Sequence, residues 1–391
     1  MRLIAGNKGT FTALAGAVVL LGIADSMTGA YLVLFAAGPA GLSPVEIGLF
    51  TSAPAAGGIV IGTLAGRRFD RRPAKSYAIA TAVLGALGFL LLTTTRSAPL
   101  LILVGGTLLA AGQAMFPQLF ALSRVVLGGP RSTPLLRSTW SLAWALGPLA
   151  GAALLPRAGF TGLLVAAALT LILAAVATAL VPAPATGRAA GPDEAAPATP
   201  PKTPIMAVAG VTLFFLAMFA GSLVLPLYVT TDLHRPGSAV GLLFSACAAI
   251  EIVAALGLAV LPERVNQRLL IGGGMVAMAA YYAITLLARS MTGLLVGQVA
   301  RAVAIAVVSA AGIRWFQELM RPAAGRATTL FANATAAGSL LAGVLAGLAI
   351  EHWGRVVTLG LCGVVALVGA AVFTFAREPS RHGDRPLARS H

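Results

Sequence analysis

Three ionisable side chains lie deep inside long apolar stretches of this 391-residue chain: Asp25, Glu251 and Arg301. Placing such a side chain at the centre of a membrane costs at least about 2.5–3.5 kcal/mol, so each is a candidate functional group by default. A carboxylate there can bind and release a proton, and a guanidinium can hold a negative charge or donate hydrogen bonds. The structural alternative for each is a hydrogen bond between packed helices.

Glu251 is the strongest candidate, because its neighbours in the apolar run offer it no local partner. We expect it to carry a coupling proton or to hydrogen-bond a solute. Asp25, flanked by Ser26 and Thr28, is a candidate second proton site. Gln298 and Arg301 are three residues apart, which places them on one face of a helix, where Arg301 can neutralise an acid or donate to solute hydroxyls.

Twelve apolar runs carry these residues, and each has roughly 18–27 residues, enough to cross a hydrocarbon core of about 30 Å. Charged residues make up only 10% of the chain and hydrophobic residues 58%, and the mean hydropathy is +0.91. A soluble domain usually has about 25% charged residues. We therefore predict an all-α membrane protein. Its twelve spans are expected at residues 10–35, 44–65, 76–95, 99–121, 138–155, 160–181, 205–231, 238–261, 269–288, 292–313, 328–350 and 356–376.

A segment rich in Pro, Ala, Gly and Thr, residues 182–204, separates the first six spans from the last six. This composition cannot bury a core and is typical of a flexible linker. We predict a six-helix half at residues 1–181, a linker at 182–204, and a second six-helix half with a short tail at 205–391.

The basic residues predict the orientation. Of the 27 Lys and Arg residues, 20 lie at the termini, in the linker or after even-numbered spans, and five lie in the opposite connectors. Arg301 and Arg314 fall within the tenth span or at its end. Since basic connectors stay inside, we expect both termini and the linker on the cytoplasmic side of the cell membrane. Topology then accounts for the net charge of +15 without a nucleic-acid partner.

No pattern in the sequence predicts an enzyme, a metal site or a cofactor. The four histidines lie in connectors or the tail, and the two cysteines, Cys247 and Cys362, lie in apolar runs without a metal-ligand neighbour. We find no nucleophile–base pair and no nucleotide-binding loop. The lipid bilayer is the one environment that the composition requires.

The connector after the second span, residues 62–72, carries Arg67, Asp70 and Arg71. It resembles the Gly-x-x-x-Asp-Arg signature loop of the major facilitator superfamily, as the division into six and six spans also does. It departs from that signature because Gly66 stands where the Asp is expected. The resemblance implies a gating role for Arg67, Asp70 and Arg71 but leaves open whether a gating salt bridge forms here.

The fifth span contains Ala143, Gly147, Pro148 and Gly151. This spacing resembles the Gly-Pro motif of proton antiporters in the same superfamily, which implies a conformational role for Gly147, Pro148 and Gly151. The structural alternative is a kinked helix that packs closely against a neighbour.

Longer stretches resemble the bacterial sugar efflux transporters. They fall in both halves of the chain and in the same order, at residues 115–124, 137–148, 249–252, 315–320 and 327–333. The resemblance implies proton-coupled export of a sugar, glycoside or similar small solute by a monomer. The superfamily fold implies alternating access to a site at the membrane midplane. It also implies that the first and tenth helices line the same cavity, so Asp25 is alternatively a counter-ion to Arg301.

Five further residues are candidates for binding such a solute. Amides suit uncharged, hydroxyl-rich molecules, and aromatic faces stack on sugar rings. The candidates are Gln113, Gln298, Asn333, Trp140 and Trp144. The structural alternatives are amides that pair between helices and tryptophans that mark a membrane interface.

Two other functions stay open at this stage. A multidrug or small-molecule exporter of the same superfamily is the first, although the aromatic content of 6% is low for a drug cavity. A non-transporting membrane receptor or scaffold is the second, and it leaves the mid-membrane acids unexplained.

Overall fold

The computed structural model describes residues 8–127, 132–183, 204–260, 265–320 and 324–376. This part of the chain contains helices and no strands. Most of the expected linker, from residue 184 to 203, and both ends of the chain lie outside the described residues.

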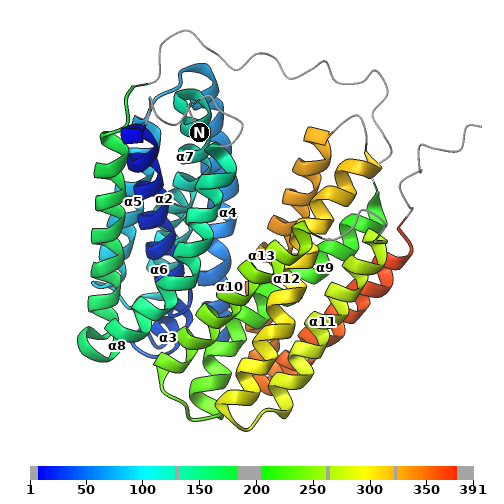
Figure 1. Cartoon of the computed structure of the whole chain (residues 1–391). Helices are drawn as coiled ribbons and strands as arrows, with labels where there is room; N and C mark the ends of the chain where they lie inside the picture. The colour runs from blue at the N-terminus through cyan, green and yellow to red at the C-terminus, as the bar shows by residue number, and fades with distance from the viewer. Residues whose placement is uncertain (1–7, 128–131, 184–203, 261–264, 321–323, 377–391) are drawn as a thin grey trace, which may run out of the picture.

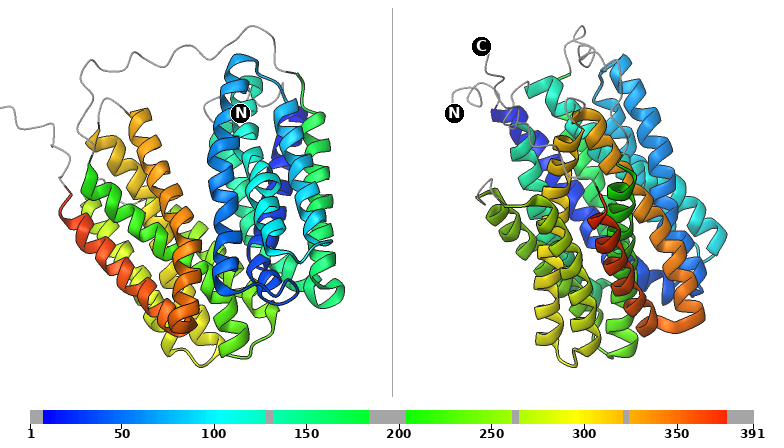
Figure 2. Two further views of the ribbon diagram at one scale, coloured as in Figure 1. Left: turned by 180° about the vertical axis from the view of Figure 1, so that it is seen from behind. Right: turned by 90° about the vertical axis from the view of Figure 1, so that its right-hand side faces the viewer.

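The helices form two groups, which Figures 1 and 2 show side by side. The first group comprises α2 (Lys8–Gly29), α3 (Leu32–Ala37), α4 (Pro44–Arg71), α5 (Ser76–Leu92), α6 (Ala98–Val104), the π-helical η1 (Gly105–Leu109), α7 (Ala110–Leu127) and α8 (Ser132–Ala179). The second comprises α9 (Ile205–Leu227), the π-helical η2 (Tyr228–Asp232), α10 (Gly237–Ala259), α11 (Gln267–Leu287), α12 (Met291–Leu319) and α13 (Ala324–Thr374).

The described chain makes twelve passes. Nine of its helical segments are long and apolar enough to cross a membrane, and α5 is a shorter apolar helix. Two of the nine, α8 and α13, each double back, at Gly159 (φ 63°) and Gly354 (φ 78°). Positive φ is readily adopted only by glycine, which lets the chain reverse almost without a loop. The predicted all-α fold with twelve spans is thus confirmed.

Several helix ends differ from the prediction. We expected Arg67, Asp70 and Arg71 in a connector, but they form the last turns of α4. Basic side chains are favourable in the last turn of a helix, where the carbonyl dipoles point, and a proline two residues after the helix stops it. Likewise α8 begins at Ser132, so Arg137 is helical, and α12 continues to Leu319.

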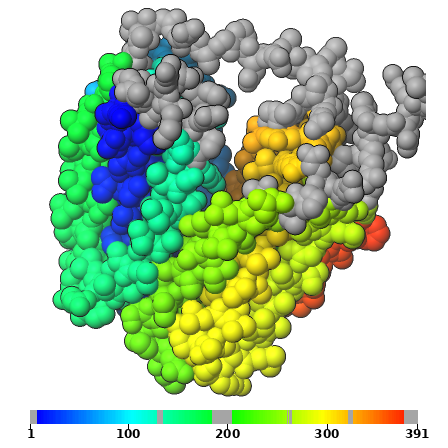
Figure 3. Space-filling view, viewed as in Figure 1, coloured from blue at the N-terminus to red at the C-terminus, as the bar shows by residue number. Residues whose placement is uncertain are grey.

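The two ends of the molecule differ. We call the end that carries Arg67, Arg71 and Lys75 the basic end, and the end where α4, α10 and α12 begin the closed end. Figure 3 shows the two groups parted at the basic end and in contact toward the closed end. Between the groups, α4 packs on α13 and α8 packs on α10.

The α4–α13 contact brings two backbones together. Gly48 of α4 lies so close to α13 that a Cβ atom on it would overlap the Gly343 carbonyl and press on Gly347. One turn along α4, Ser52 Oγ donates to the Leu340 carbonyl at 2.9 Å. Small residues allow this approach, which favours association of helices in lipid.

Large apolar side chains are exposed over the outer faces of both groups, among them Leu103, Leu169, Val253 and Leu287. In a soluble protein such a surface would be an aggregation hazard, whereas lipid covers it without cost. Because lipid covers the outer faces, the polar side chains that could form a binding site are expected on the inner faces.

Candidate functional site

A cavity of about 450 Å³ lies among α2, α4, α5, α7 and α8, and α9 and α13 of the second group also contribute to its lining. Four of the predicted site residues line it together: Asp25, Gln113, Trp140 and Trp144. Further lining residues include Phe89, Phe116 and Leu171 from the first group, and Phe219 and Ser339 from the second. The volume is in the range of small-molecule sites, about 300–1,000 Å³.

Asp25 presents a carboxylate that no described residue binds by a hydrogen bond or an ion pair. The hydroxyls beside it are already used, because Ser26 Oγ donates to the Gly22 carbonyl at 2.7 Å and Thr28 Oγ1 donates to the Ala24 carbonyl at 2.7 Å. Asp25 is half-buried, and it lines the cavity. Its carboxylate is therefore available to a solute or a proton.

Aromatic rings form one wall of the cavity. The ring centroids of Phe116 and Trp140 are 4.5 Å apart, and those of Trp140 and Trp144 are 6.2 Å apart. The guanidinium of Arg137 lies over the Phe116 ring at 5.7 Å. These contacts fix the ring planes, so the wall is a stacking surface prepared before a solute arrives.

The α2–α8 contact brings Asp25 and this wall to the same cavity. A Cβ atom on Gly147 would overlap Ser26 Oγ, and one on Gly151 would press on the Tyr31 ring. The Tyr31 hydroxyl in turn donates to the Pro148 carbonyl at 3.3 Å. Gly147, Pro148 and Gly151 thus make a closely packed helix, which is the structural alternative raised from the sequence.

Arg301 lies in the second group and is only 4% exposed. Its Nη2 atom donates to Ser222 Oγ at 2.6 Å, and its Nη1 atom donates to Gln298 Oε1 at 3.4 Å. The guanidinium also lies over the rings of Phe244, at 4.9 Å, and Tyr281, at 5.6 Å. The shared helical face predicted for Gln298 and Arg301 is present, and these two residues do not line the cavity.

Glu251 stands on α10, half-buried and without a hydrogen bond or ion pair to any described residue. The positive charges that act on it most are Arg301 on its own group and Arg137 across the interface. Asp25 and Arg301 make no ion pair in the described chain, so the counter-ion arrangement is absent from this conformation.

The remaining predicted residues lie elsewhere. Asn333 is exposed on α13 and does not line the cavity. Arg67, Asp70 and Arg71 are exposed at the basic end, where Asp70 pairs with no described basic residue. The altered signature segment therefore makes no salt bridge through Asp70 within the described chain.

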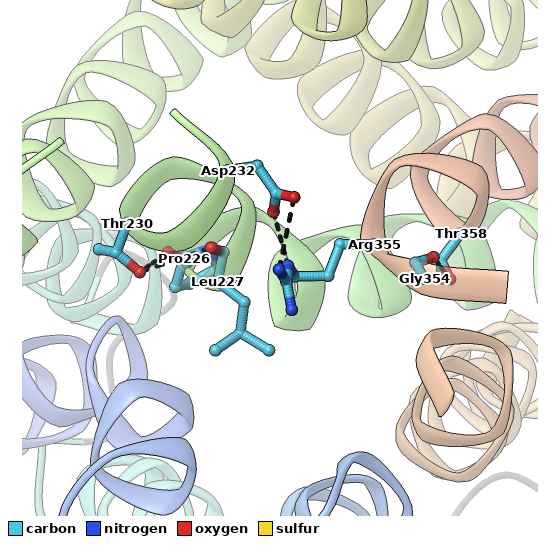
Figure 4. Close-up of polar contacts among 7 residues, drawn as sticks. All are labelled: Pro226, Leu227, Thr230, Asp232, Gly354, Arg355 and Thr358. Atoms are coloured by element: carbon cyan, nitrogen blue, oxygen red, sulfur yellow. Dashed lines mark hydrogen bonds and ion pairs between the residues drawn. The ribbon is translucent and has the colours of Figure 1, made fainter. Parts of the chain in front are cut away.

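An ion pair at the closed end was not predicted. Figure 4 shows the Arg355 guanidinium facing the Asp232 carboxylate, with Nε to Oδ2 at 2.5 Å and Nη2 to Oδ1 at 3.4 Å. Arg355 directly follows the reversal at Gly354, and Asp232 ends η2. The pair therefore connects the turn within α13 to the end of η2.

The sequence also gave no indication of Ser222, Phe244 and Tyr281 around Arg301. These residues come from α9, α10 and α11, and no spacing along the chain connects them. Phe116, by contrast, falls within a stretch that resembles the sugar efflux transporters.

Apolar passes around a cavity lined by an acid, an amide and aromatic rings are the features of a multi-pass membrane transporter. The sequence model of the Major Facilitator Superfamily matches residues 14–230 and 207–390 of this chain. The chain belongs to the Major Facilitator Superfamily.

Individual relatives of known name point to one group within this superfamily. The chain is 35% identical over 378 residues to a putative sugar efflux transporter of Deinococcus radiodurans, covering 93% of this chain and 97% of the relative. It is 29% identical to sugar efflux transporter A of Dickeya chrysanthemi, covering 90% and 92%. The predicted similarity to sugar efflux transporters is thereby confirmed. Among solved structures, the nucleoside transporter NupG shares the fold with a TM-score of 0.76 at 12% identity, over 96% of this chain and 98% of that one.

Proposed function

We propose that this protein exports sugars, glycosides or similar small solutes across the cytoplasmic membrane in exchange for protons. The observation that carries the proposal is the cavity, which combines Asp25 and Gln113 with the aromatic wall of Phe116, Trp140 and Trp144. The names of the relatives support the solute class.

Solute binding follows from the chemistry of this lining. A sugar presents C–H faces that stack on aromatic rings, and its hydroxyls take hydrogen bonds from an amide or a carboxyl group. Trp140 and Trp144 supply the stacking surface, and Gln113 and Asp25 supply the polar contacts. Because most of the wall is fixed by ring contacts, little ordering is needed on binding.

Proton coupling is assigned to Asp25 and Glu251. Both carboxylates lack a partner among the described residues, so each can change its charge by binding a proton. Arg301 is a cation in the same helix group as Glu251, and a cation favours the charged form of an acid that approaches it. A change in the distance between them during transport would release or recruit the proton.

The two helix groups are proposed to rock about the cavity as two halves, residues 1–181 and 205–391, joined by the linker at 182–204. The basic end faces the cytoplasm in this proposal, because cytoplasmic segments are rich in Lys and Arg. Gly147, Pro148 and Gly151 allow α8 to pack closely on α2 while the halves move. Arg67 and Arg71 lie at the end of α4, at the basic end, where the two halves must come together in the opposite conformation.

The test uses inverted membrane vesicles that contain the full chain. Uptake of labelled sugars, and of aromatic dyes that the same wall would accept, is followed after a proton gradient is imposed. We expect gradient-driven uptake of a sugar by the wild type and a loss of at least about tenfold in Glu251→Gln or Asp25→Asn, because each removes a titrating group. Glu318→Gln, an acid of α12 paired with Arg314 near the basic end, is the matched control.

The outcomes separate the parts of the proposal. Uptake driven by the gradient in both acid variants would show that the proton sites are misassigned. Dye uptake without sugar uptake would favour the multidrug alternative. No uptake of either by the wild type would contradict the export function.

A further inference from the structure

Within the described chain, the side chains in direct contact with the buried Arg301 guanidinium are neutral, and Glu251 is an acid whose charge acts on it from farther away. The two hydrogen-bond acceptors of the guanidinium are a hydroxyl and an amide oxygen, and its other neighbours are the rings of Phe244 and Tyr281. No carboxylate in the described chain comes within 4.0 Å of it. A guanidinium has five N–H donors, so three of them are not used here.

Other hydrogen-bonding groups beside Arg301 are poorly satisfied. Tyr281 Oη, Thr285 Oγ1 and Gln298 Nε2 are buried. The Tyr281 side chain lies within reach of the other two, but none of the three atoms makes a hydrogen bond of good geometry within the described chain. A Cβ atom on Gly297, beside Gln298, would lie 3.4 Å from Thr285 Oγ1, so α11 and α12 pack closely here. Three side chains from α11 and α12 therefore surround one cation with polar atoms that are not fully satisfied, which native proteins rarely leave in their interiors.

Donors outnumber acceptors in this cluster. The guanidinium and the Gln298 amide can offer only N–H groups to a bound ligand, because the amide oxygen already accepts from Arg301. The hydroxyls of Tyr281 and Thr285 can orient as donors. The group that would satisfy all of them is negatively charged and carries several acceptor lone pairs. A carboxylate fits, and its two oxygens match the fork of a guanidinium.

The cluster lies beside the cavity. Ser222, which accepts from Arg301, stands one turn of α9 from Phe219, and Phe219 lines the cavity. Ser222 and Phe244 are only half-buried, so the cluster is not sealed on that side. The hydrogen bond from Arg301 to Ser222 and three residues of α9 thus connect the cluster to the cavity lining.

We propose that Arg301, with Gln298, Tyr281 and Thr285, is a binding site for the carboxylate of an acidic sugar. This proposal rests on the proposed export function and extends its solute class from neutral sugars to sugar acids. The sugar ring occupies the cavity, and the carboxylate enters the cluster past Ser222. Glu251 keeps its own role, because it does not contact the guanidinium.

The test measures binding to the purified full-length protein by thermal unfolding, at constant ionic strength with methanesulfonate as the background anion. The probes are D-galacturonate, D-galactose and chloride. We expect galacturonate to protect the wild type best. Arg301→Gln should bind galacturonate on the order of ten- to a hundredfold more weakly, since a charge-assisted hydrogen-bond pair is lost, and its affinity for galactose should fall by a smaller factor.

Two further variants separate binding from folding. Tyr281→Phe keeps the ring under the guanidinium and removes only the hydroxyl, so we expect a severalfold weaker affinity for galacturonate. Arg314→Gln makes the same substitution on the same helix outside the cluster, and it should bind galacturonate like the wild type.

Each outcome bears on the proposal. Equal affinities of Arg301→Gln and Arg314→Gln for galacturonate, or no effect of Tyr281→Phe, would overturn it. Protection by chloride equal to that by galacturonate would overturn the sugar-acid assignment and give the site to an inorganic anion. Galacturonate binding that depends on Arg301, in a protein whose vesicles move no sugar, would uphold this site while the export function fails.

Discussion

The approach of Gly48 to the backbone of α13 exists only while the two helix groups are packed at the closed end. We predict that Gly48→Ala opens that end. The added Cβ would overlap the Gly343 carbonyl and press on Gly347, and both obstacles are backbone atoms that cannot rotate away. The substitution therefore strains the conformation in which α4 and α13 are packed at the closed end. It does not strain a conformation in which the two helix groups are apart at that end.

The magnitude follows from overpacking. Inserting a carbon into a filled contact typically costs about 1–3 kcal/mol. Since about 1.4 kcal/mol is a factor of ten in an equilibrium constant, the ratio of closed-end-packed to opened molecules should fall about 5- to 150-fold. The same substitution at Gly62, also on α4, meets nothing within 4 Å and serves as the matched control.

The assay is a distance measurement between spin labels on exposed residues of the two groups at the closed end, Ala158→Cys and His352→Cys. The two native cysteines, Cys247 and Cys362, are buried and are replaced by alanine. We expect Gly48→Ala to move the distance distribution toward longer values and Gly62→Ala to leave it unchanged. A Gly48→Ala distribution that matches the wild type would refute the reasoning.

Two further predictions concern stability in detergent. Asp232→Asn should lower the free energy of unfolding by about 1 kcal/mol or less, because its ion pair with Arg355 is partly exposed. A double-mutant cycle with Arg355→Gln measures the interaction energy of the pair, and an interaction energy above about 3 kcal/mol would contradict the prediction. Tyr282→Phe removes a buried hydroxyl that donates to the Ala217 carbonyl at 2.6 Å and should destabilise by about 1 kcal/mol. Tyr77→Phe is its control, and equal melting temperatures for the two variants would show that the Tyr282 bond contributes nothing.

The number and type of passes could be predicted because a hydrocarbon core imposes a length and an apolar composition on each one. The ends could not, because helices continue into the polar boundary, where composition no longer distinguishes helix from connector. Arg67 and Arg71 illustrate this, since their charges suggest a connector while the helix dipole favours them in a last turn.

The candidate site was predictable residue by residue but not as an arrangement. Asp25 and Trp140 stand out by type, yet only the α2–α8 packing places them around one cavity. The bond from Arg301 to Ser222 joins positions 79 residues apart, and the Asp232–Arg355 pair joins positions 123 apart. Contacts over such separations have no signature in a single sequence.

The reversals at Gly159 and Gly354 also bear on the origin of the chain. They are 195 residues apart, and the helices that begin the second pass of each group, α4 at Pro44 and α10 at Gly237, start 193 residues apart. A nearly constant offset is what duplication of an ancestral half-length gene would leave behind, with the turn inherited in both copies. The π-helical segments break that repetition, because η1 lies in the fourth pass of the first copy and η2 in the first pass of the second. The two copies therefore differ in backbone conformation beside the cavity, which Leu109 of η1 lines, and beside the Asp232–Arg355 pair, where η2 ends. Differences between the halves at these two positions are candidates for the changes that set solute preference.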